Sequence, residues 1–248
     1  MILKNIKRQI ANKIMYAISR MLWKFYDNQS LVGTGYIIEN KYFPVIKEME
    51  DNWKKIRDEL FTILEYRKHI PFFHEVSTEN SSISKGGDWK TFGLHGFQYK
   101  YNDNCSLAPY TTSLLDKIPN LRTSFFSILA PGAHILPHKG HTRGILTAHL
   151  CLTLPKNNKG CALRINNKNL YWKKGKIFIF DDTYEHEAWN KTDEERVVLL
   201  FNFDRPMKKL GHLIHDFTIK IFLKSEYMKS VQRNMKRINN KMKLSFKI

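Results

Sequence analysis

The sequence predicts a mainly β domain, an antiparallel sandwich or small barrel, with flanking helices. From about residue 121, short alternating or apolar runs recur between turn residues such as Asn166-Asn167, a spacing typical of sandwiches and barrels. The chain, with 248 residues of which 42% are apolar, is also long enough to bury one sizeable core. The expected strands cover residues 122–129, 133–136, 145–154, 161–165, 169–172, 176–181 and 196–203.

The region before these strands predicts helices. Residues 44–68 form an amphipathic pattern, because Pro44 suits a first helical turn and apolar side chains recur on one face. The residues of that face are Ile46, Met49, Trp53, Ile56, Leu60 and Leu64. The polar, Gly/Ser-rich residues 77–88 predict a loop, and residues 111–118 predict a short helix that ends before Pro119.

Positive charge gathers at the two ends of the chain. Lys and Arg number 41 against 23 acids, which gives a formal net charge of +18. Residues 1–26 hold six basic residues and no acid, and residues 206–248 hold eleven against two acids, so the ends carry +15 of this charge. We therefore expect a basic amphipathic helix at 1–35, a central domain at 36–206 and a basic helical tail at 207–248.

The ends also carry apolar residues at helical spacing. In the N-terminal segment these are Ile2, Ile6, Ile10, Ile14, Ile18 and Leu22. Three interpretations stay open: a helix packed on the domain with a solvated basic face, an amphipathic helix on an anionic membrane surface, or a nucleic-acid arm. The aromatic residues lie mostly in the middle of the chain, so we expect no specific nucleic-acid partner.

The cysteines and the hydropathy bear on the compartment. Cys105, Cys151 and Cys161 stand far apart with no CxxC pair, which argues against a disulfide scaffold or a zinc ribbon. No run of 18 or more apolar residues predicts a transmembrane helix, and basic residues within the first 13 positions interrupt any signal peptide. We expect a cytoplasmic protein, peripheral on the inner face of the membrane if its basic ends bind lipid.

Residues that suit a metal site gather in two places of the β-rich part. His138 is followed by His149 along the next strand, and residues 180–187 (FDDTYEHE) contain His186, with Arg196 ten residues later. Two histidines on different strands with open coordination positions are typical of non-haem Fe(II) oxygenases, and an Arg can grip a carboxylate. On spacing alone, structural histidines, a zinc hydrolase and an iron oxygenase all stay open.

Residues 123–206 closely resemble the aspartyl/asparaginyl β-hydroxylase family of Fe(II)/2-oxoglutarate-dependent dioxygenases, which includes bacterial lipid A 2-hydroxylase-like members. The matching text is SFFSILAPGAHILPHKGHTRG, LTAHLCLTLP, GCALRINNKNLYWKKGKIFIFDDTYEHEAWN and ERVVLLFNFDRP. A weaker match extends the resemblance over residues 43–206 and leaves both basic ends outside. The proximal His-x-Gly, the FDDxxxHE block and the downstream Arg all occur in register.

The resemblance implies a double-stranded β-helix, or jelly roll, over about residues 90–206. His138 and His186 would be the iron ligands, and Gly140 stands where most 2-oxoglutarate oxygenases carry Asp or Glu. That absence is similar to the pattern of animal aspartyl β-hydroxylases, in which two His suffice. Fe(II), 2-oxoglutarate and O₂ are the implied cofactors, with ascorbate as a reductant. The acids that would orient an imidazole are Asp181, Asp182 and Glu185.

A 2-oxoglutarate pocket is also implied by the resemblance. Arg196 matches the family residue that pairs with the distal carboxylate, and Ser127 and His149 match positions that also contact the cosubstrate. An Arg common in the family two residues before His149 is Thr147 here, with Arg143 as the nearby cation that would compensate. Pocket lining is one interpretation of three aromatics, but core packing is the favoured one; they are Trp89, Phe92 and Trp189.

Three functions stay open. The favoured one is hydroxylation of the β-carbon of Asp or Asn in a peptide or protein, which the Gly140 pattern supports. The second is 2-hydroxylation of a lipid A fatty acyl chain, because lipid A 2-hydroxylases are similar around residues 183–186 and 204–207 and because basic ends suit an anionic membrane surface. The third is a non-catalytic binding module, which the intact His138, His186 and Arg196 disfavour.

Overall fold

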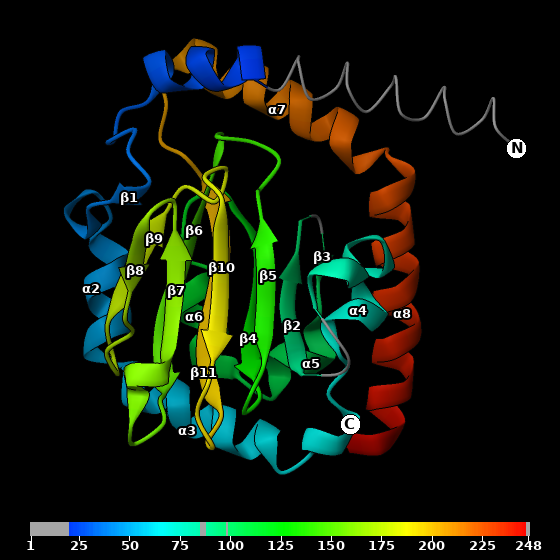
Figure 1. The fold of residues 1–248 in the computed structure, drawn as a ribbon. Coiled ribbons are helices and arrows are strands. Elements are labelled where there is room, and N and C mark those ends of the chain that lie inside the picture. The colour runs from blue at the N-terminus through cyan, green and yellow to red at the C-terminus, as the bar shows by residue number, and fades with distance from the viewer. Residues whose placement is uncertain (1–19, 85–87, 98, 247–248) are drawn as a thin grey trace, which may run out of the picture.

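The structure is a computed structural model that describes residues 20–84, 88–97 and 99–246. Two antiparallel sheets face each other (Figure 1), a large one of order β1-β9-β6-β11-β4-β2-β3 and a small one of order β5-β10-β7-β8. The large sheet contains β1 (Ile37–Ile38), β2 (Trp89–Gly96), β3 (Tyr99–Lys100), β4 (Leu121–Leu129), β6 (Ile145–Thr153), β9 (Ile177–Phe180) and β11 (Arg196–Asp204). The small sheet contains β5 (His134–His138), β7 (Cys161–Ile165), β8 (Lys168–Leu170) and β10 (His186–Asn190).

From β4 onward the chain alternates between the two sheets. β4, β6, β9 and β11 belong to the large sheet, and the strands between them belong to the small one. This winding is the double-stranded β-helix, so the predicted mainly β jelly-roll fold is confirmed. Each predicted strand lies within about two residues of an observed one, whereas β2 and β10 were not predicted as strands.

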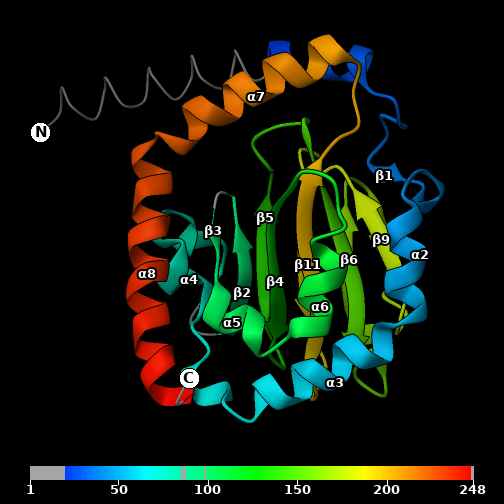
Figure 2. The same ribbon diagram turned by 180° about the vertical axis from the view of Figure 1, so that it is seen from behind.

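The core has two layers. Cys151, Leu163 and Val198 pack between the sheets, and Phe92, Leu150 and Phe201 pack between the large sheet and its helices. Those helices lie on the outer face of the large sheet (Figure 2). Because both faces are covered, β6 is buried at every position except its last, in place of the alternation of a half-exposed strand.

The covering helices largely follow the sequence prediction. The predicted helix at 44–68 is two helices, α2 (Pro44–Asp51) and α3 (Trp53–Leu64), with Asn52 between them. The predicted short helix is α6 (Pro109–Leu115), which begins at its proline, and α5 (Asn102–Ser106) precedes it. The expected loop at 77–88 contains a 3₁₀ helix, η3 (Thr78–Ile83).

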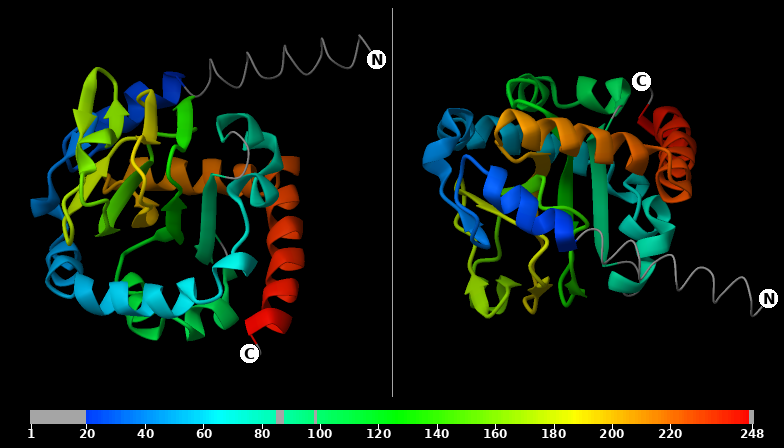
Figure 3. Two further views of the ribbon diagram at one scale, coloured as in Figure 1. Left: turned by 60° about the horizontal axis from the view of Figure 1, so that its bottom comes forward. Right: turned by 90° about the horizontal axis from the view of Figure 1, so that it is seen from above.

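The C-terminal residues form two helices that border the sheets. α7 (Lys209–Leu223) crosses the end of the sheets where β5 ends and β10 begins, and α8 (Glu226–Phe246) runs down one side against α4 (Phe73–Val76) (Figures 1 and 3). Residues 20–29 are helical and lie beside α7, while the predicted helical pattern before residue 20 falls outside the described residues. No helix in the described part of the chain is long and apolar enough to span a membrane.

Candidate active site

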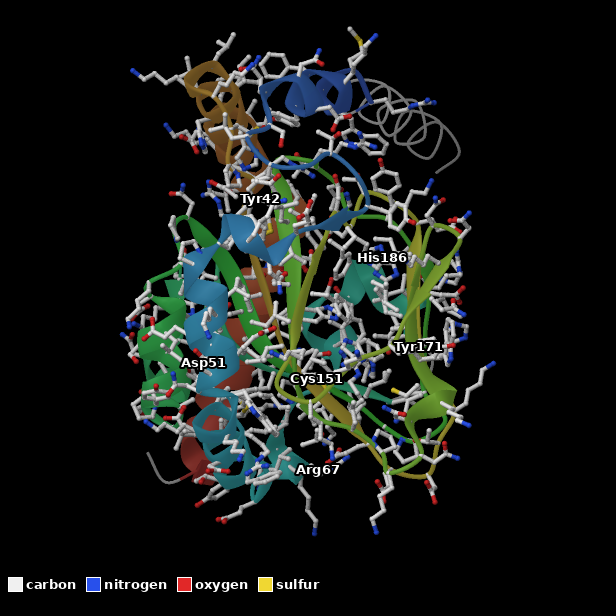
Figure 4. The ribbon with its side chains drawn as sticks, turned by 90° about the vertical axis from the view of Figure 1, so that its left-hand side faces the viewer. Tyr42, Asp51, Arg67, Cys151, Tyr171 and His186 are labelled. Atoms are coloured by element: carbon white, nitrogen blue, oxygen red, sulfur yellow. The ribbon has the colours of Figure 1, made fainter. Side chains whose placement is uncertain are left out.

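His138 and His186 face each other at the open end of the jelly roll, which we call the mouth. His138 is the last residue of β5 and His186 is the first of β10, and the two are register partners across these strands. Their ring centroids lie 4.1 Å apart. Figure 4 shows His186 nearer than Cys151 to the end that α7 crosses. The antiparallel register therefore brings together two imidazoles that are 48 positions apart in the chain.

Each imidazole is held by its own strand. The Nδ1 of His138 lies 2.7 Å from the carbonyl oxygen of Leu136, and the Nδ1 of His186 lies 3.0 Å from that of Tyr184. A proton donated from Nδ1 to a carbonyl fixes the tautomer and leaves the lone pair on Nε2, the form in which a histidine binds a metal.

Burial favours the neutral form of both rings. Loss of solvation lowers the pKa of His138, and loss of solvation followed by the charge of His138 lowers the pKa of His186 to about 4. Neutral imidazole is the ligating species, so the environment suits a divalent cation. Within residues 20–84, 88–97 and 99–246, no three His, Cys, Asp or Glu side chains gather as a metal site.

A buried ion pair orders the loop that leads into His186. Asp181 accepts a 2.5 Å hydrogen bond from Arg205 Nη2, and both side chains are fully buried. The Oδ1 of Asp181 also accepts from the backbone and hydroxyl of Thr183, at 3.0 and 2.6 Å. Arg205 donates to the carbonyl oxygens of Gly33 and Arg143 as well. The approach of the chain to His186 is thereby tied to three other segments.

The carboxylate of Asp182 lies beside Gly140. A Cβ built on Gly140 would stand 2.7 Å from Asp182 Oδ2 and nearer still to Oδ1. Gly140 also donates its backbone N–H to the carbonyl oxygen of Asp182, at 2.7 Å. Thr147 donates to Asp182 Oδ2 at 3.2 Å and accepts from Asn202 Nδ2 at 2.7 Å. Burial, and then the charge of Asp181, raise the pKa of Asp182 to about 7.

Arg196 lies between the sheets with no acidic partner in the described part of the chain. Its Nη1 donates to the carbonyl and hydroxyl oxygens of Ser127 at 3.3 and 3.4 Å, and its guanidinium stacks 4.6 Å from the Trp172 ring. Its Nε finds no hydrogen-bond acceptor. Burial lowers the pKa of Arg196. A buried guanidinium without a counter-ion is suited to receive a carboxylate ligand.

His149 adds two more unpaired polar atoms to this region. Neither ring nitrogen has a hydrogen-bond partner, and the ring lies against Trp172, Phe178 and Phe180. Burial, and then the charge of Arg196, hold the pKa of His149 well below its usual value. Buried polar atoms normally have partners, so the unpaired nitrogens of His149 and Arg196 indicate that a polar ligand completes this region.

Trp172 is a site residue that the sequence reasoning missed. Its indole is 1% exposed, its Nε1 is unpaired, and it contacts both Arg196 and His149. The available signal was its position at the end of a predicted strand, directly before the Lys173-Lys174-Gly175 turn.

The structure separates other predicted residues from this region. Arg143 is bound to Asp27, lies 3.2 Å from Thr183 Oγ1 and packs on the rings of Trp23 and Tyr184, so its guanidinium is committed to the N-terminal segment. Its predicted role in cosubstrate binding stays a prediction.

Neither Phe92 nor Trp189 lines the space between the sheets, and the favoured core packing is confirmed for Phe92. Phe92 packs between the large sheet and the helices. Trp189 lies on the outer face of the small sheet. Side chains alternate along a strand, so the side chain of Trp189 points to the face away from the buried Ala188 and lies beside His134. Trp89 does lie between the sheets and donates from Nε1 to Ser127 Oγ at 2.9 Å.

The comparison with known proteins identifies a family for this chain. The sequence matches the family described as aspartyl/asparaginyl beta-hydroxylase over residues 50–206. The chain belongs to this family. The family resemblance read from the motifs is thus confirmed, and His138, His186 and Arg196 all fall inside the matched span.

Two curated relatives in the family are hydroxylases, which supports an enzymatic function. One is an ornithine lipid ester-linked acyl 2-hydroxylase from Rhizobium tropici, 37% identical over 205 residues that make up 83% of this chain and 73% of the relative. Another is the Homo sapiens aspartyl/asparaginyl beta-hydroxylase, 35% identical over 68% of this chain but only 22% of the relative. Among solved structures, a Pseudomonas putida prolyl-4-hydroxylase covers 65% of this chain and 99% of its own, at 15% identity and a TM-score of 0.41.

Proposed function

We propose that this protein is an Fe(II)- and 2-oxoglutarate-dependent dioxygenase that hydroxylates an acyl chain of a membrane lipid. The observation that best supports oxygenase chemistry is the arrangement of two histidines and one arginine between the sheets. Two neutral imidazoles face each other at the mouth, and a buried Arg196 without a counter-ion lies on the opposing sheet. This donor set fits a divalent cation with open positions and a dicarboxylate beside it.

Each residue has a separate role in this proposal. The Nε2 atoms of His138 and His186 would hold the iron, which with 2-oxoglutarate and O₂ supplies the power to hydroxylate an unactivated carbon. Arg196 would bind the distal carboxylate of 2-oxoglutarate, and Ser127 would donate its hydroxyl proton to the same ligand. His149 would donate its ring N–H, which has no partner within the protein, to the same ligand. Asp182 would accept hydrogen bonds at the edge of the histidine pair.

We favour a lipid substrate over a peptide because the lipid hydroxylase aligns with a larger share of this chain, and of its own length, than the human protein does. The lipid acyl 2-hydroxylase aligns over 205 residues, which extends past the family span of 50–206, and the alignment takes in most of both chains. The human protein aligns over about a fifth of its own length. We place the enzyme on the cytoplasmic side, at the membrane surface. Ascorbate would serve as an accessory reductant.

Hydroxylation of the β-carbon of Asp or Asn in a peptide is the second candidate. Gly140 favours this candidate. It stands at the position, two residues after His138, where most 2-oxoglutarate oxygenases carry an acid, so two histidines would be the metal donors. The intact pair and the unpaired Arg196 speak against a non-catalytic binding module.

The test measures succinate formed from 2-oxoglutarate with Fe(II), ascorbate and O₂, with lipid extract or Asp/Asn peptides added. Succinate that rises with lipid, together with acyl chains that gain one oxygen in mass spectrometry, would support the proposal. His138→Ala should abolish both signals, while His134→Ala, on the same strand but the outer face, should retain them. Stimulation by peptide alone would replace the lipid with the second candidate, and His138-independent succinate would overturn the oxygenase.

A further inference from the structure

The outward face of α7 carries a row of exposed apolar side chains. Leu210, Leu213, Phe217 and Ile221, which we call the α7 stripe, are 53%, 68%, 63% and 58% exposed. Their spacing of three and four residues places them along one side of the helix. Four large apolar side chains in line on a single exposed helix face exceed the scattered exposure that a protein surface normally shows.

The opposite face of α7 is already used for packing. Gly211, His215 and Ile219 are buried, and His215 Nε2 lies 2.9 Å from the buried carboxylate of Asp204. The helix is therefore fixed to the body through its inner face, and the α7 stripe points away from it. Packing within the described part of the chain explains the apolar residues on the inner face of α7, but not those of the α7 stripe.

The neighbouring N-terminal segment extends this apolar surface. Met21 and Leu31 are 78% and 58% exposed. The segment is joined to α7 by the hydrogen bond of Tyr26 with Thr218 at 3.1 Å, and to the residues that precede α7 by the bond from Leu31 N to Pro206 O at 2.9 Å. Six of the ten large apolar side chains that are exposed in the described residues thus lie at this one end of the molecule.

The charges around the stripe are almost all positive. Exposed lysines lie on and beside α7, whereas the one exposed acid within it, Asp216, is paired with Arg122 at 3.3 Å. The exposed basic residues are Arg20, Lys24, Lys208, Lys209, Lys220 and Lys224. An apolar row flanked by lysines has the composition of a helix that lies in the interface of an anionic membrane.

This surface adjoins the mouth. Phe222, at the C-terminal end of α7, contacts His141, three residues after His138, with ring centroids 6.1 Å apart. In the view from above, α7 and the helix of residues 20–29 lie across the ends of the strands (Figure 3). A surface that rested on α7 would therefore lie next to the ends of β5 and β10 that carry His138 and His186.

We propose that α7 is a membrane-docking helix, which inserts the α7 stripe into an anionic lipid surface while its lysines contact the headgroups. The choice of lipid as the occupant rests on the proposed function and on the charge around the stripe. Docking in this way holds the mouth against the membrane, where an acyl chain is within reach. It accounts for an apolar outer face that the described part of the chain leaves uncovered.

Sedimentation of the full chain with vesicles tests the proposal. We expect binding to phosphatidylglycerol vesicles and little binding to phosphatidylcholine. Leu213→Ser with Phe217→Ser should weaken it by at least about tenfold, because two apolar side chains are lost from the interface. The matched control is Phe61→Ser with Tyr171→Ser, which removes two exposed aromatics elsewhere and should bind as wild type.

The charge contribution has its own comparison. Lys209→Gln, Lys220→Gln and Lys224→Gln together should lower the affinity for phosphatidylglycerol vesicles on the order of 100-fold at low salt. The control, Lys54→Gln, Lys168→Gln and Lys173→Gln, makes the same change of charge on exposed lysines away from α7. Equal losses in the two sets would show a general charge effect and overturn the docking helix.

A fluorescent label distinguishes lipid from other occupants. Phe217→Cys carrying an environment-sensitive dye should shift to the blue when phosphatidylglycerol vesicles are added, and Phe61→Cys should not; the three native cysteines are buried. A blue-shifted signal at position 217 before lipid is added would mean that this chain or a second copy covers the stripe, and would overturn the proposal. So would the absence of a shift with vesicles.

These measurements need no turnover, so the two proposals fail separately. A wild type that docks through α7 but oxidises no lipid would remove the lipid hydroxylase and keep the docking helix. Variants of the α7 stripe that hydroxylate vesicle lipid as fast as wild type would remove the docking helix and keep the enzyme. The stripe variants should retain succinate formation in the absence of lipid, because none of the replaced residues contacts the histidine pair.

Discussion

The carboxylate of Asp182 occupies the space into which any side chain at Gly140 would project. A Cβ at position 140 would lie 2.7 Å from Oδ2 and closer to Oδ1, while the backbone N–H of Gly140 donates to the carbonyl oxygen of the same aspartate. The acid that most 2-oxoglutarate oxygenases carry two residues after the first histidine is thus absent here, and a carboxylate from the loop before the second histidine lies beside that position. The two residues depend on each other sterically.

This dependence predicts how substitutions at the two positions combine. Gly140→Ala should lower the free energy of unfolding by about 1–3 kcal/mol through the clash with Asp182. Adding Asp182→Gly should restore part of that loss, because the obstructing carboxylate is removed, and Gly140→Asp with Asp182→Gly should be the best tolerated acid exchange. Urea unfolding of the wild type, Gly140→Ala, Asp182→Gly and Gly140→Ala with Asp182→Gly gives the coupling. Strictly additive effects would show that the two side-chain positions do not compete for space.

The histidine pair predicts the metal affinity. Loss of one imidazole, in His138→Ala or His186→Ala, should weaken Fe(II) binding by more than about tenfold, since loss of a mere supporting contact already costs 10–100-fold in metal sites. Anaerobic titration with Fe(II) measures this. The control is His134→Ala, whose ring lies on the outer face with Glu187. Equal Fe(II) affinity in all three variants would refute the metal assignment.

Arg196, which has no acidic partner in the described residues, predicts how tightly the enzyme binds 2-oxoglutarate. In Arg196→Ala the apparent KM for 2-oxoglutarate should rise roughly 100-fold, which corresponds to the loss of about 3 kcal/mol from a buried charged hydrogen bond. Initial rates at a range of 2-oxoglutarate concentrations measure it. Arg164→Gln is the control, because Arg164 pairs with Glu187 and Glu185 on the outer face. If the KM stays unchanged, another cation binds the carboxylate.

The anchor of α7 predicts a dependence of stability on pH. Burial alone would raise the pKa of Asp204, but hydrogen bonds from His215 and Arg122 outweigh it, and the pKa lies below its ordinary value. A depressed pKa adds stability above the unfolded value of about 4, and this stability is lost as the pH falls further. Asp204→Asn should lower the free energy of unfolding by about 3 kcal/mol at neutral pH.

Unfolding measured as a function of pH checks this relationship. The difference between wild type and Asp204→Asn should shrink below about pH 4, since the wild type then loses the same charge. A difference that stays constant through the acid range would mean that Asp204 acts through packing alone.

Much of the fold was predictable because its signals are local. The strands between residues 121 and 204 follow from runs of apolar residues between turns, and the helices at 44–64 follow from a periodic face. β10 was not predicted, because its five residues (HEAWN) show no alternation of polar and apolar side chains, although their burial alternates in the structure. Phe92 and Trp189 could not be assigned to one face from the sequence, because strand pairing, and not residue type, decides which face of a sheet points to the site.

By itself the sequence determined the fold class and the family, and it indicated His138, His186 and Arg196 as candidate site residues, because motif spacing and alternation are properties of the chain alone. Only the tertiary structure decided which of these residues meet. The register of β5 with β10 joins the two histidines, the facing of the sheets leaves Arg196 and His149 unpaired, and the closure of a loop sets Asp182 beside Gly140. It also separated the two sides of α7, since only packing shows which apolar residues are buried and which stay exposed. The physical reason is that contacts between distant segments depend on pairing and packing, which local patterns do not specify.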